Sequence, residues 1–238
     1  MYQSVFKRYE LKYLLTRQQK ALLLQEMKPY MQLDKYGKTT IRNIYFDTDN
    51  YRLIRRSLEK PAYKEKLRVR SYCRAESADP VFVELKKKYK SVVYKRRVVM
   101  PQRQAIGWLC DGTAHPEKSQ IADEIDYFCS FYQNLRPTVF LSYEREAYYS
   151  VSGDDFRVTF DENILSRCAD ISLSADIWGT PLLPEGMVLL ELKTPGGIPL
   201  WMTRFLTEQK IYKTSFSKYG TAYCRQILQP TTGEQNYV

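Results

Sequence analysis

Residues 83–98 decide the fold, and they read Val83-Glu-Leu-Lys-Lys-Lys-Tyr-Lys-Ser-Val-Val-Tyr-Lys-Arg-Arg-Val98. We interpret this stretch as two β-strands of one hairpin that carry a high density of positive charge. Glu84, Lys86, Lys88 and Lys90 share one parity, so in a strand they project from one face. Lysines alone are typical of a solvated edge strand. A carboxylate at the head of the row indicates a more specific arrangement.

The same alternation occurs in three other segments. Like charges that lie opposite each other across a sheet repel, and a bound polyanion removes that cost. We therefore expect the four rows to face one another inside one barrel and to surround a strongly anionic ligand. The three further rows are Arg8, Glu10 and Lys12; Lys64, Lys66, Arg68 and Arg70; and Glu191 with Lys193.

Composition is consistent with such a ligand. The 238 residues include 44% hydrophobic side chains and carry a formal net charge of +10, which favours an anionic partner. The length predicts a single domain over residues 1–228, with a helical insert at about 101–134 and a flexible tail at 229–238. Five scattered cysteines predict reduced thiols. With no signal peptide and no long apolar run, we expect a cytoplasmic protein.

Periodicity predicts the elements around the charged rows. The predicted fold class is α+β, an eight-stranded antiparallel β-barrel with helices packed outside. Charge inside and apolar residues outside requires such helices as a cover. We expect strands at 2–15, 39–46, 64–74, 81–89, 91–100, 138–150, 156–161 and 187–194. We expect helices at 17–31, with Thr16 as N-cap, and at 51–59, 200–211 and 218–228; residues 166–185 are expected to be mostly irregular.

Several common chemistries are poorly supported. His115 is the only histidine, which argues against a catalytic triad and excludes a histidine zinc site. Neither a glycine-rich phosphate loop nor a dinucleotide-binding motif is present, so side chains must bind any phosphate. Arginine binds phosphate oxygens in a bidentate way and lysine adds point charges. Carboxylates among them suit Mg²⁺ or Mn²⁺.

At this point the chain resembles the triphosphate tunnel metalloenzymes, and among them the polyphosphate polymerase domain of the vacuolar transporter chaperone (VTC) type. The resemblance covers nearly the whole chain and implies an eight-stranded tunnel lined with basic residues and acidic metal ligands. Each motif is short, and their order and spacing make the signal specific. The motifs are Arg8-Tyr-Glu-Leu-Lys-Tyr13, Ile44-Tyr-Phe-Asp-Thr48, Lys66-Leu-Arg-Val-Arg70, Phe82-Val-Glu-Leu-Lys-Lys-Lys88, Arg136-Pro-Thr-Val139, Arg157-Val-Thr-Phe-Asp161, Leu190-Glu-Leu-Lys193 and Ser215-Phe-Ser-Lys-Tyr219.

The resemblance also implies roles for individual residues. Arg68, Arg70 and Arg157 would stabilise charge on the transferred group, and replacing Arg70 or Arg157 by Ala should lower the rate by roughly 10²–10³. Glu191 is the first metal-ligand candidate; Glu10, Glu84 and Asp161 either join it or position basic side chains. The expected phosphate-binding residues are Lys12, Lys66, Arg68, Arg70, Lys86, Lys88, Lys95, Arg145, Arg157, Lys193 and Lys218, the last at the tunnel mouth.

Two positions depart from the family pattern. Arg8 stands where many tunnel hydrolases have the first glutamate of Glu-x-Glu-x-Lys, which favours the polymerase branch. Ser215 stands where the polymerase branch can carry a second lysine, which weakens the expected grip on a product chain.

The function expected from these features is phosphoryl transfer from ATP to inorganic polyphosphate with Mn²⁺ or Mg²⁺. A metal-dependent tripolyphosphatase or nucleoside triphosphatase on the same fold remains open, as does a non-catalytic polyphosphate-binding module. We expect no nucleic-acid partner, because carboxylates in the basic rows would repel its backbone. Coupling to export would need a membrane partner protein, and the oligomeric state stays open. Tyr45 and Tyr143 are either stacking platforms for a nucleobase or part of the barrel wall.

Overall fold

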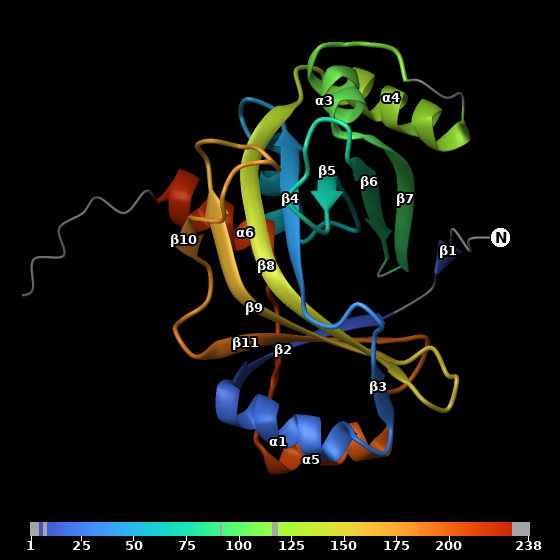
Figure 1. Cartoon of the computed structure of the whole chain (residues 1–238), viewed down its shortest axis with the longest axis vertical. Coiled ribbons are helices and arrows are strands. Elements are labelled where there is room, and N and C mark those ends of the chain that lie inside the picture. Colours follow the sequence, from blue (N-terminus) through green and yellow to red (C-terminus); the bar gives the residue numbers. More distant parts are fainter. Residues whose placement is uncertain (1–4, 7–8, 91, 116–118, 230–238) are drawn as a thin grey trace, which may run out of the picture.

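The computed structural model describes residues 5–6, 9–90, 92–115 and 119–229, with side chains from residue 9 onward. The predicted α+β class is confirmed: one large antiparallel sheet curves through the molecule, and helices pack on its outside (Figure 1). The predicted tail falls almost wholly on residues 230–238, outside the described residues.

The sheet contains twelve strands, ten of them in one hydrogen-bonded path. The path runs β1-β7-β6-β5-β4-β8-β9-β11-β2-β12, while β10 pairs with β9 and β3 with β8. The strands are β1 (Val5–Phe6), β2 (Tyr9–Thr16), β3 (Met31–Leu33), β4 (Thr39–Asp47), β5 (Tyr63–Ser71), β6 (Pro80–Tyr89), β7 (Val92–Pro101), β8 (Arg136–Ser150), β9 (Arg157–Arg167), β10 (Thr180–Pro181), β11 (Met187–Thr194) and β12 (Lys213–Thr214).

The prediction of a closed eight-stranded barrel is therefore wrong in two respects. The sheet has more strands, and in the described part of the chain its ladder is an open path from β1 to β12. Both end strands, β1 on β7 and β12 on β2, are only two residues long. A side-chain contact spans the gap instead, since Lys86 Nζ on β6 lies 3.3 Å from Glu10 Oε2 on β2.

Three apolar clusters join the sheet to its helices. In the first two, apolar residues alternate with the charged rows along the strands and therefore lie on the outer face. The third lies on the inner face and includes Tyr45 and Tyr143, which also line the cavity described below. One cluster joins β4–β8 to α2 (Arg52–Leu58), α3 (Gln102–Cys110) and α4 (Gln120–Tyr132). The second joins β2, β9 and β11 to α1 (Arg17–Met27) and α5 (Leu200–Glu208). The third joins β4, β8, β9 and β11 to α2 and α6 (Lys218–Tyr223).

Helix α1 begins as predicted and ends earlier than predicted. The Thr16 side chain accepts a hydrogen bond from Gln19 N at 3.1 Å, and the Gln19 side chain bonds back to Thr16 N, a capping box. The chain leaves the helix after Met27, and Met31 begins strand β3. Met31 still packs in the same cluster as Leu23 and Met27. The four-residue spacing of Leu23, Met27 and Met31 therefore predicted correctly that all three are buried. It predicted the end of the helix incorrectly.

Other boundaries also differ from the predictions. Strand β9 extends to Arg167, into the stretch predicted to be irregular, and β10 lies in that stretch too. The helix predicted at 200–211 ends at Glu208. The helix predicted at 218–228 is α6 followed by one π-helical turn, Cys224–Leu228.

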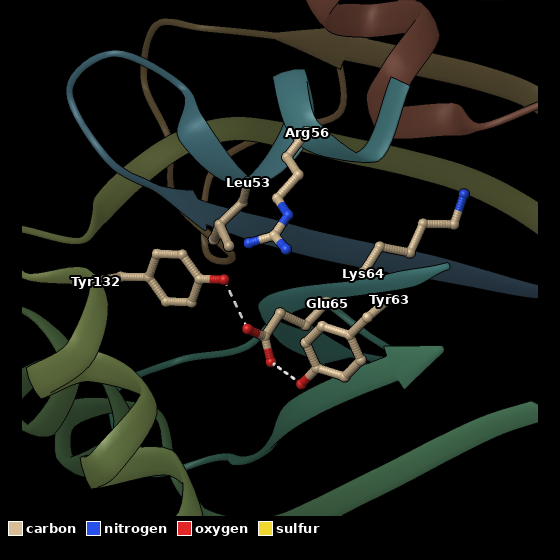
Figure 2. A pocket seen from close by; sticks show the side chains of 6 residues that line it. All are labelled: Leu53, Arg56, Tyr63, Lys64, Glu65 and Tyr132. Atoms are coloured by element: carbon tan, nitrogen blue, oxygen red, sulfur yellow. Dashed lines mark hydrogen bonds between the residues drawn. The ribbon is translucent and has the colours of Figure 1, made fainter. Parts of the chain in front are cut away.

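A carboxylate on β5 joins helix α4 to the sheet (Figure 2). Glu65 on β5 accepts hydrogen bonds from Tyr132 of α4 and from Tyr63, each at 2.6 Å. Leu53 and Arg56 of α2 close the other side of a cavity of only about 10 Å³, room for about one water molecule. This contact is structural, and it holds α4 against the outer side of β5.

None of the helices in the described ranges combines the length and apolarity needed to cross a bilayer. All five cysteines are free thiols.

Candidate functional site

The inner face of the curved sheet encloses a cavity of about 540 Å³. Protein sites for small ligands typically measure about 300–1,000 Å³. Eight strands, namely β2, β4, β5, β6, β7, β8, β9 and β11, contribute side chains to the lining, together with the start of α6. Charged residues two apart in a strand project to the same face, which places the four charged rows around one space.

Basic residues dominate the lining of this cavity. Eleven basic and two acidic residues line it, and two further carboxylates, Glu84 and Asp161, pair with the lining from beneath. The surplus positive charge is what an anion with several negative groups would neutralise. The basic lining residues are Lys12, Lys66, Arg68, Arg70, Lys86, Lys95, Arg97, Arg145, Arg157, Lys193 and Lys218.

Glu84 anchors one group of these cations. Its carboxylate is fully buried and lies 2.7 Å from Arg68 Nη2 and 2.7 Å from Lys95 Nζ. Arg97 donates to the same carboxylate through Nε at 2.8 Å, and Arg70 Nε lies 3.9 Å away. One buried carboxylate thus holds four cationic side chains from β5 and β7 at the cavity wall.

Neutral side chains fix the direction of the two arginines on β5. Arg70 donates to Asn43 Oδ1 at 2.9 Å and to the Tyr143 hydroxyl at 3.1 Å. Arg68 donates to the Tyr45 hydroxyl at 3.0 Å. Both guanidinium groups are therefore held in place before any ligand binds, which is the arrangement that stabilises developing charge best.

Asp161 and Glu191 anchor a second group on the opposite side of the cavity. Arg145 binds Asp161 in a bidentate way, with Nε–Oδ1 at 2.5 Å and Nη2–Oδ2 at 2.6 Å, and its Nη2 also donates to Glu191 at 3.2 Å. Lys218 lies 2.5 Å from Asp161 and 3.1 Å from Glu191. The first residue of α6 is therefore tied to strands β9 and β11.

Glu10 and Lys12 complete this side of the cavity. Lys12 Nζ lies 3.2 Å from Glu10 and 3.5 Å from Glu191, and it donates to the Phe216 carbonyl at 2.8 Å. Because Lys86 also contacts Glu10, these side chains connect β2, β6 and β11.

The charges set the ionisation of the site. Burial raises the pKa of the Glu84 carboxyl group, but Arg68, Arg70 and further cations outweigh it and hold the pKa well below its usual 4.5. Glu191 behaves in the same way, with Lys218 as its strongest neighbour. Burial and the Lys86 ammonium together lower the pKa of Lys66 to about 7. Lys66 is therefore only partly protonated at neutral pH without a ligand.

The structure brings most of the predicted residues together. Ten of the eleven predicted phosphate-binding residues line the cavity, the exception being Lys88. Arg157 lines it from the rim, where its side chain is 55% exposed and lies 3.8 Å from Asp155. Among the predicted metal ligands, Glu10 and Glu191 line the cavity. Arg8 lies outside the described residues.

The four candidate metal ligands differ in their surroundings. Within the described residues, no group of three or more His, Cys, Asp or Glu side chains is arranged as a metal site. Both oxygens of Asp161 bind Arg145, and Glu84 is surrounded by cations, which suits positioning. Glu10 and Glu191 face the cavity and share the Lys12 ammonium. Their donor chemistry fits Mg²⁺ or Mn²⁺, which proteins often hold through one or two carboxylates plus substrate phosphates.

Sequence reasoning missed four lining residues, the apolar Val93 and the polar Arg97, Ser217 and Tyr219. Arg97 shares the parity of Lys95 on β7, so the alternation rule could have found it. Ser217 caps α6 through Gly220 N and also accepts a hydrogen bond from Lys66 at 3.1 Å. Tyr219 stacks on Tyr45 with ring centroids 4.7 Å apart. The last two stand in the motif at 215–219, but their place in the lining depends on where α6 docks.

Comparisons with solved structures agree with this architecture. A "putative adenylate cyclase" from Bacillus halodurans is 17% identical, with a TM-score of 0.56, over 90% of this chain and 96% of that one. A protein from Hippeastrum, described as a putative adenylyl cyclase with a dominant triphosphatase activity, is also 17% identical, with a TM-score of 0.51 over 89% and 93% of the two chains. At this identity the likeness concerns the fold alone. No curated protein matches the sequence.

A family model matches far more of the chain than any single motif does. The model of the VTC domain matches residues 7–226, which include every strand and helix that contributes to the cavity. The chain therefore belongs to the VTC domain family.

Proposed function

We propose that this protein is a metal-dependent polyphosphate polymerase that transfers the γ-phosphate of ATP to a growing inorganic polyphosphate chain. The observation that carries the proposal is the pair Arg68 and Arg70. Both line the cavity, both are anchored by buried or cavity-wall partners, and both point into a space crowded with further cations. Membership of the VTC domain family supports the same assignment.

The reaction needs positioning and charge neutralisation more than proton transfer. The bond between the γ-phosphorus and the β–γ bridging oxygen breaks, and a terminal phosphate oxygen of the acceptor chain bonds to that phosphorus, with ADP leaving. The acceptor oxygen is already anionic at neutral pH, so no general base is required. His115, the single histidine, is not among the cavity-lining residues. The fixed cations of the cavity provide the alignment and the electrostatic stabilisation.

Individual side chains have distinct tasks in this scheme. Arg68 and Arg70 bind the oxygens of the transferred group as negative charge develops on them. Lys12, Lys86 and Lys218 bind the phosphates on either side of it. Glu84 and Asp161 hold these cations in place and do not touch the substrate, because both carboxylates are fully buried beneath the lining.

Glu191 and Glu10 are the residues that would hold Mg²⁺ or Mn²⁺. When bound, such an ion would supply positive charge that stabilises the negative charge of the phosphates. The two carboxylates would also keep Lys12 close to the same phosphates, since both already contact its ammonium group.

A tripolyphosphatase is the second candidate. The observation that favours it is the pair of carboxylates at the cavity surface, which could also orient a water molecule. The structural relative from Hippeastrum carries a described triphosphatase activity, and the fold it shares with this chain is compatible with that reaction.

The test is to incubate the purified protein with ATP and Mn²⁺ and to analyse both polyphosphate chains on a gel and free phosphate in solution. A polymerase yields a ladder of chains that is lost in Glu191→Gln and retained in the control Glu185→Gln, an exposed carboxylate outside the cavity. Free phosphate without chains would support the hydrolase instead. Binding of tripolyphosphate without either product would reduce the protein to a binding module.

A further inference from the structure

Three successive rows of side chains cross β5, β6 and β7 on the inner face of the sheet. In the first row Arg68 lies opposite Glu84, and Glu84 opposite Arg97. In the second row Lys66, Lys86 and Lys95 lie opposite one another. Carboxylates pair with most members of both rows: Glu84 binds Arg68, Arg97 and Lys95, and Glu10 binds Lys86. The remaining member, Lys66, donates to the Ser217 hydroxyl group at 3.1 Å.

The third row has no such compensation. Lys64 lies directly opposite Lys88, and the next residue across is Val93. Among the described residues no carboxylate lies within 4.0 Å of either ammonium group, and the only hydrogen bond that Lys64 makes is a long one to the Ser57 carbonyl, at 3.5 Å. Opposed like charges cost free energy unless an anion lies between them.

The surroundings of this row add further positive charge. Burial lowers the pKa of Lys64, and Lys88, Lys12 and Lys86 lower it further, with Lys60 also contributing. Both lysines of the row are half-buried. Neither lines the 540 Å³ cavity, and each lies two residues along its strand from a residue that does, Lys66 or Lys86. Two residues along a strand span about 6.8 Å, so the third row continues the line of cations just beyond the cavity.

We infer that Lys64 and Lys88 form an outer subsite that binds the phosphates of a polyphosphate chain extending out of the cavity. This inference rests on the proposed function and specifies its preference: a long chain contacts the outer row, whereas tripolyphosphate is held by the inner rows alone. The subsite therefore favours long polyanions over short ones without contributing to the chemistry.

The experiment compares affinities for tripolyphosphate and for long-chain polyphosphate, measured by calorimetry over a series of salt concentrations. The variants are K64Q/K88Q, the conservative K64R/K88R, and the control K28Q/K35Q. The control makes the same change in net charge at residues on the turns that flank β3, away from the hairpin of β6 and β7 (Figure 1).

We expect K64Q/K88Q to keep the wild-type affinity for tripolyphosphate and to bind long chains about tenfold more weakly, the effect of losing two half-exposed ion pairs. Its log–log salt slope for long chains should fall by about 1.4, since each charge contact to a single-stranded polyanion contributes about 0.7. K64R/K88R should restore both values. Unchanged long-chain affinity relative to K28Q/K35Q, or an equal loss for both ligands, would overturn the outer subsite. Failure of the wild-type protein to bind either ligand would instead overturn the proposed function together with it.

Discussion

The Glu84→Gln substitution tests whether a buried carboxylate holds the cationic wall of the cavity together. Glu84 is fully buried and contacts Arg68, Arg70, Lys95 and Arg97. Glutamine has nearly the same shape and cannot carry the negative charge. The change therefore leaves four cations facing one another without a counter-charge.

The expected loss of stability follows from the burial of Glu84 among its cationic partners. Breaking a buried ion pair by removing one partner costs about 3–5 kcal/mol, because the remaining charge is uncompensated. For a domain of this size 1 kcal/mol corresponds to roughly 2–4 °C in Tm, so the expected loss is roughly 6–20 °C. Added tripolyphosphate should recover more of the Tm in Glu84→Gln than it adds to the wild-type protein, because the anion replaces the missing charge.

The assay is thermal unfolding followed by circular dichroism, with and without tripolyphosphate. Glu144→Gln is the control, since Glu144 pairs with Lys38 at 2.6 Å on the surface and its side chain is 34% exposed. An exposed pair contributes only about 0–1 kcal/mol. A Tm of Glu84→Gln equal to that of Glu144→Gln, or a smaller response to tripolyphosphate than in the wild-type protein, would refute the anchoring role of Glu84.

Four further expectations follow from the same geometry. Arg70→Ala should lower kcat by roughly 10²–10³, as expected for one lost transition-state donor. Arg157→Ala should lower kcat by less, because the Arg157 side chain is 55% exposed at the rim of the cavity. Steady-state kinetics measures both effects, with Arg204→Ala, a change at an exposed arginine of α5, as the control. Since the pKa of Lys66 is lowered to about 7, tripolyphosphate affinity should fall as pH rises above 7, and calorimetry should find a shallower pH dependence in Lys66→Gln. Between about pH 7 and 10.5 the unfolded chain binds more protons at Lys66 than the folded chain does. Lys66 should therefore raise the free energy of unfolding of the ligand-free protein as pH rises from about 7 towards its usual pKa of 10.5. Urea unfolding of the wild-type protein and of Lys66→Gln over this pH range checks the sign. Thr16→Ala should cost about 1 kcal/mol through loss of the α1 cap, and an unchanged unfolding midpoint in urea would contradict that value.

Alternation along strands carried most of the information about the site. Because residues two apart share a face, the rows at Glu84–Lys88, Lys64–Arg70 and Glu191–Lys193 predicted a common inner surface, and the structure places most of them around one cavity. The same rule applied to β7 would have added Arg97. The alternation rule does not show where along a strand the cavity ends. It therefore predicted Lys88 as a lining residue, although Lys88 lies beyond the end of the cavity.

The missed features depend on contacts between distant segments. Whether Glu84 or Asp161 binds a metal or anchors a cation depends on which strands lie beside it, and their cationic partners come from several different strands. The two end strands of the sheet, β1 and β12, were not predicted as separate strands either. At two residues each they are too short to produce a periodic pattern in the sequence. Met31 shows the same limit at a helix end, since its burial is compatible with a helix or a strand.

The central claim is that the cavity transfers the γ-phosphate of ATP to a polyphosphate chain. The most direct measurement is to supply ATP labelled either at the γ- or at the α-phosphate, together with Mn²⁺, and to follow each label by gel. Our account predicts that the γ-label enters long chains, that the α-label stays in ADP, and that Arg70→Ala lowers the rate of transfer by roughly 10²–10³. A γ-label found only in free phosphate, or in chains formed equally well by Arg70→Ala, would contradict it.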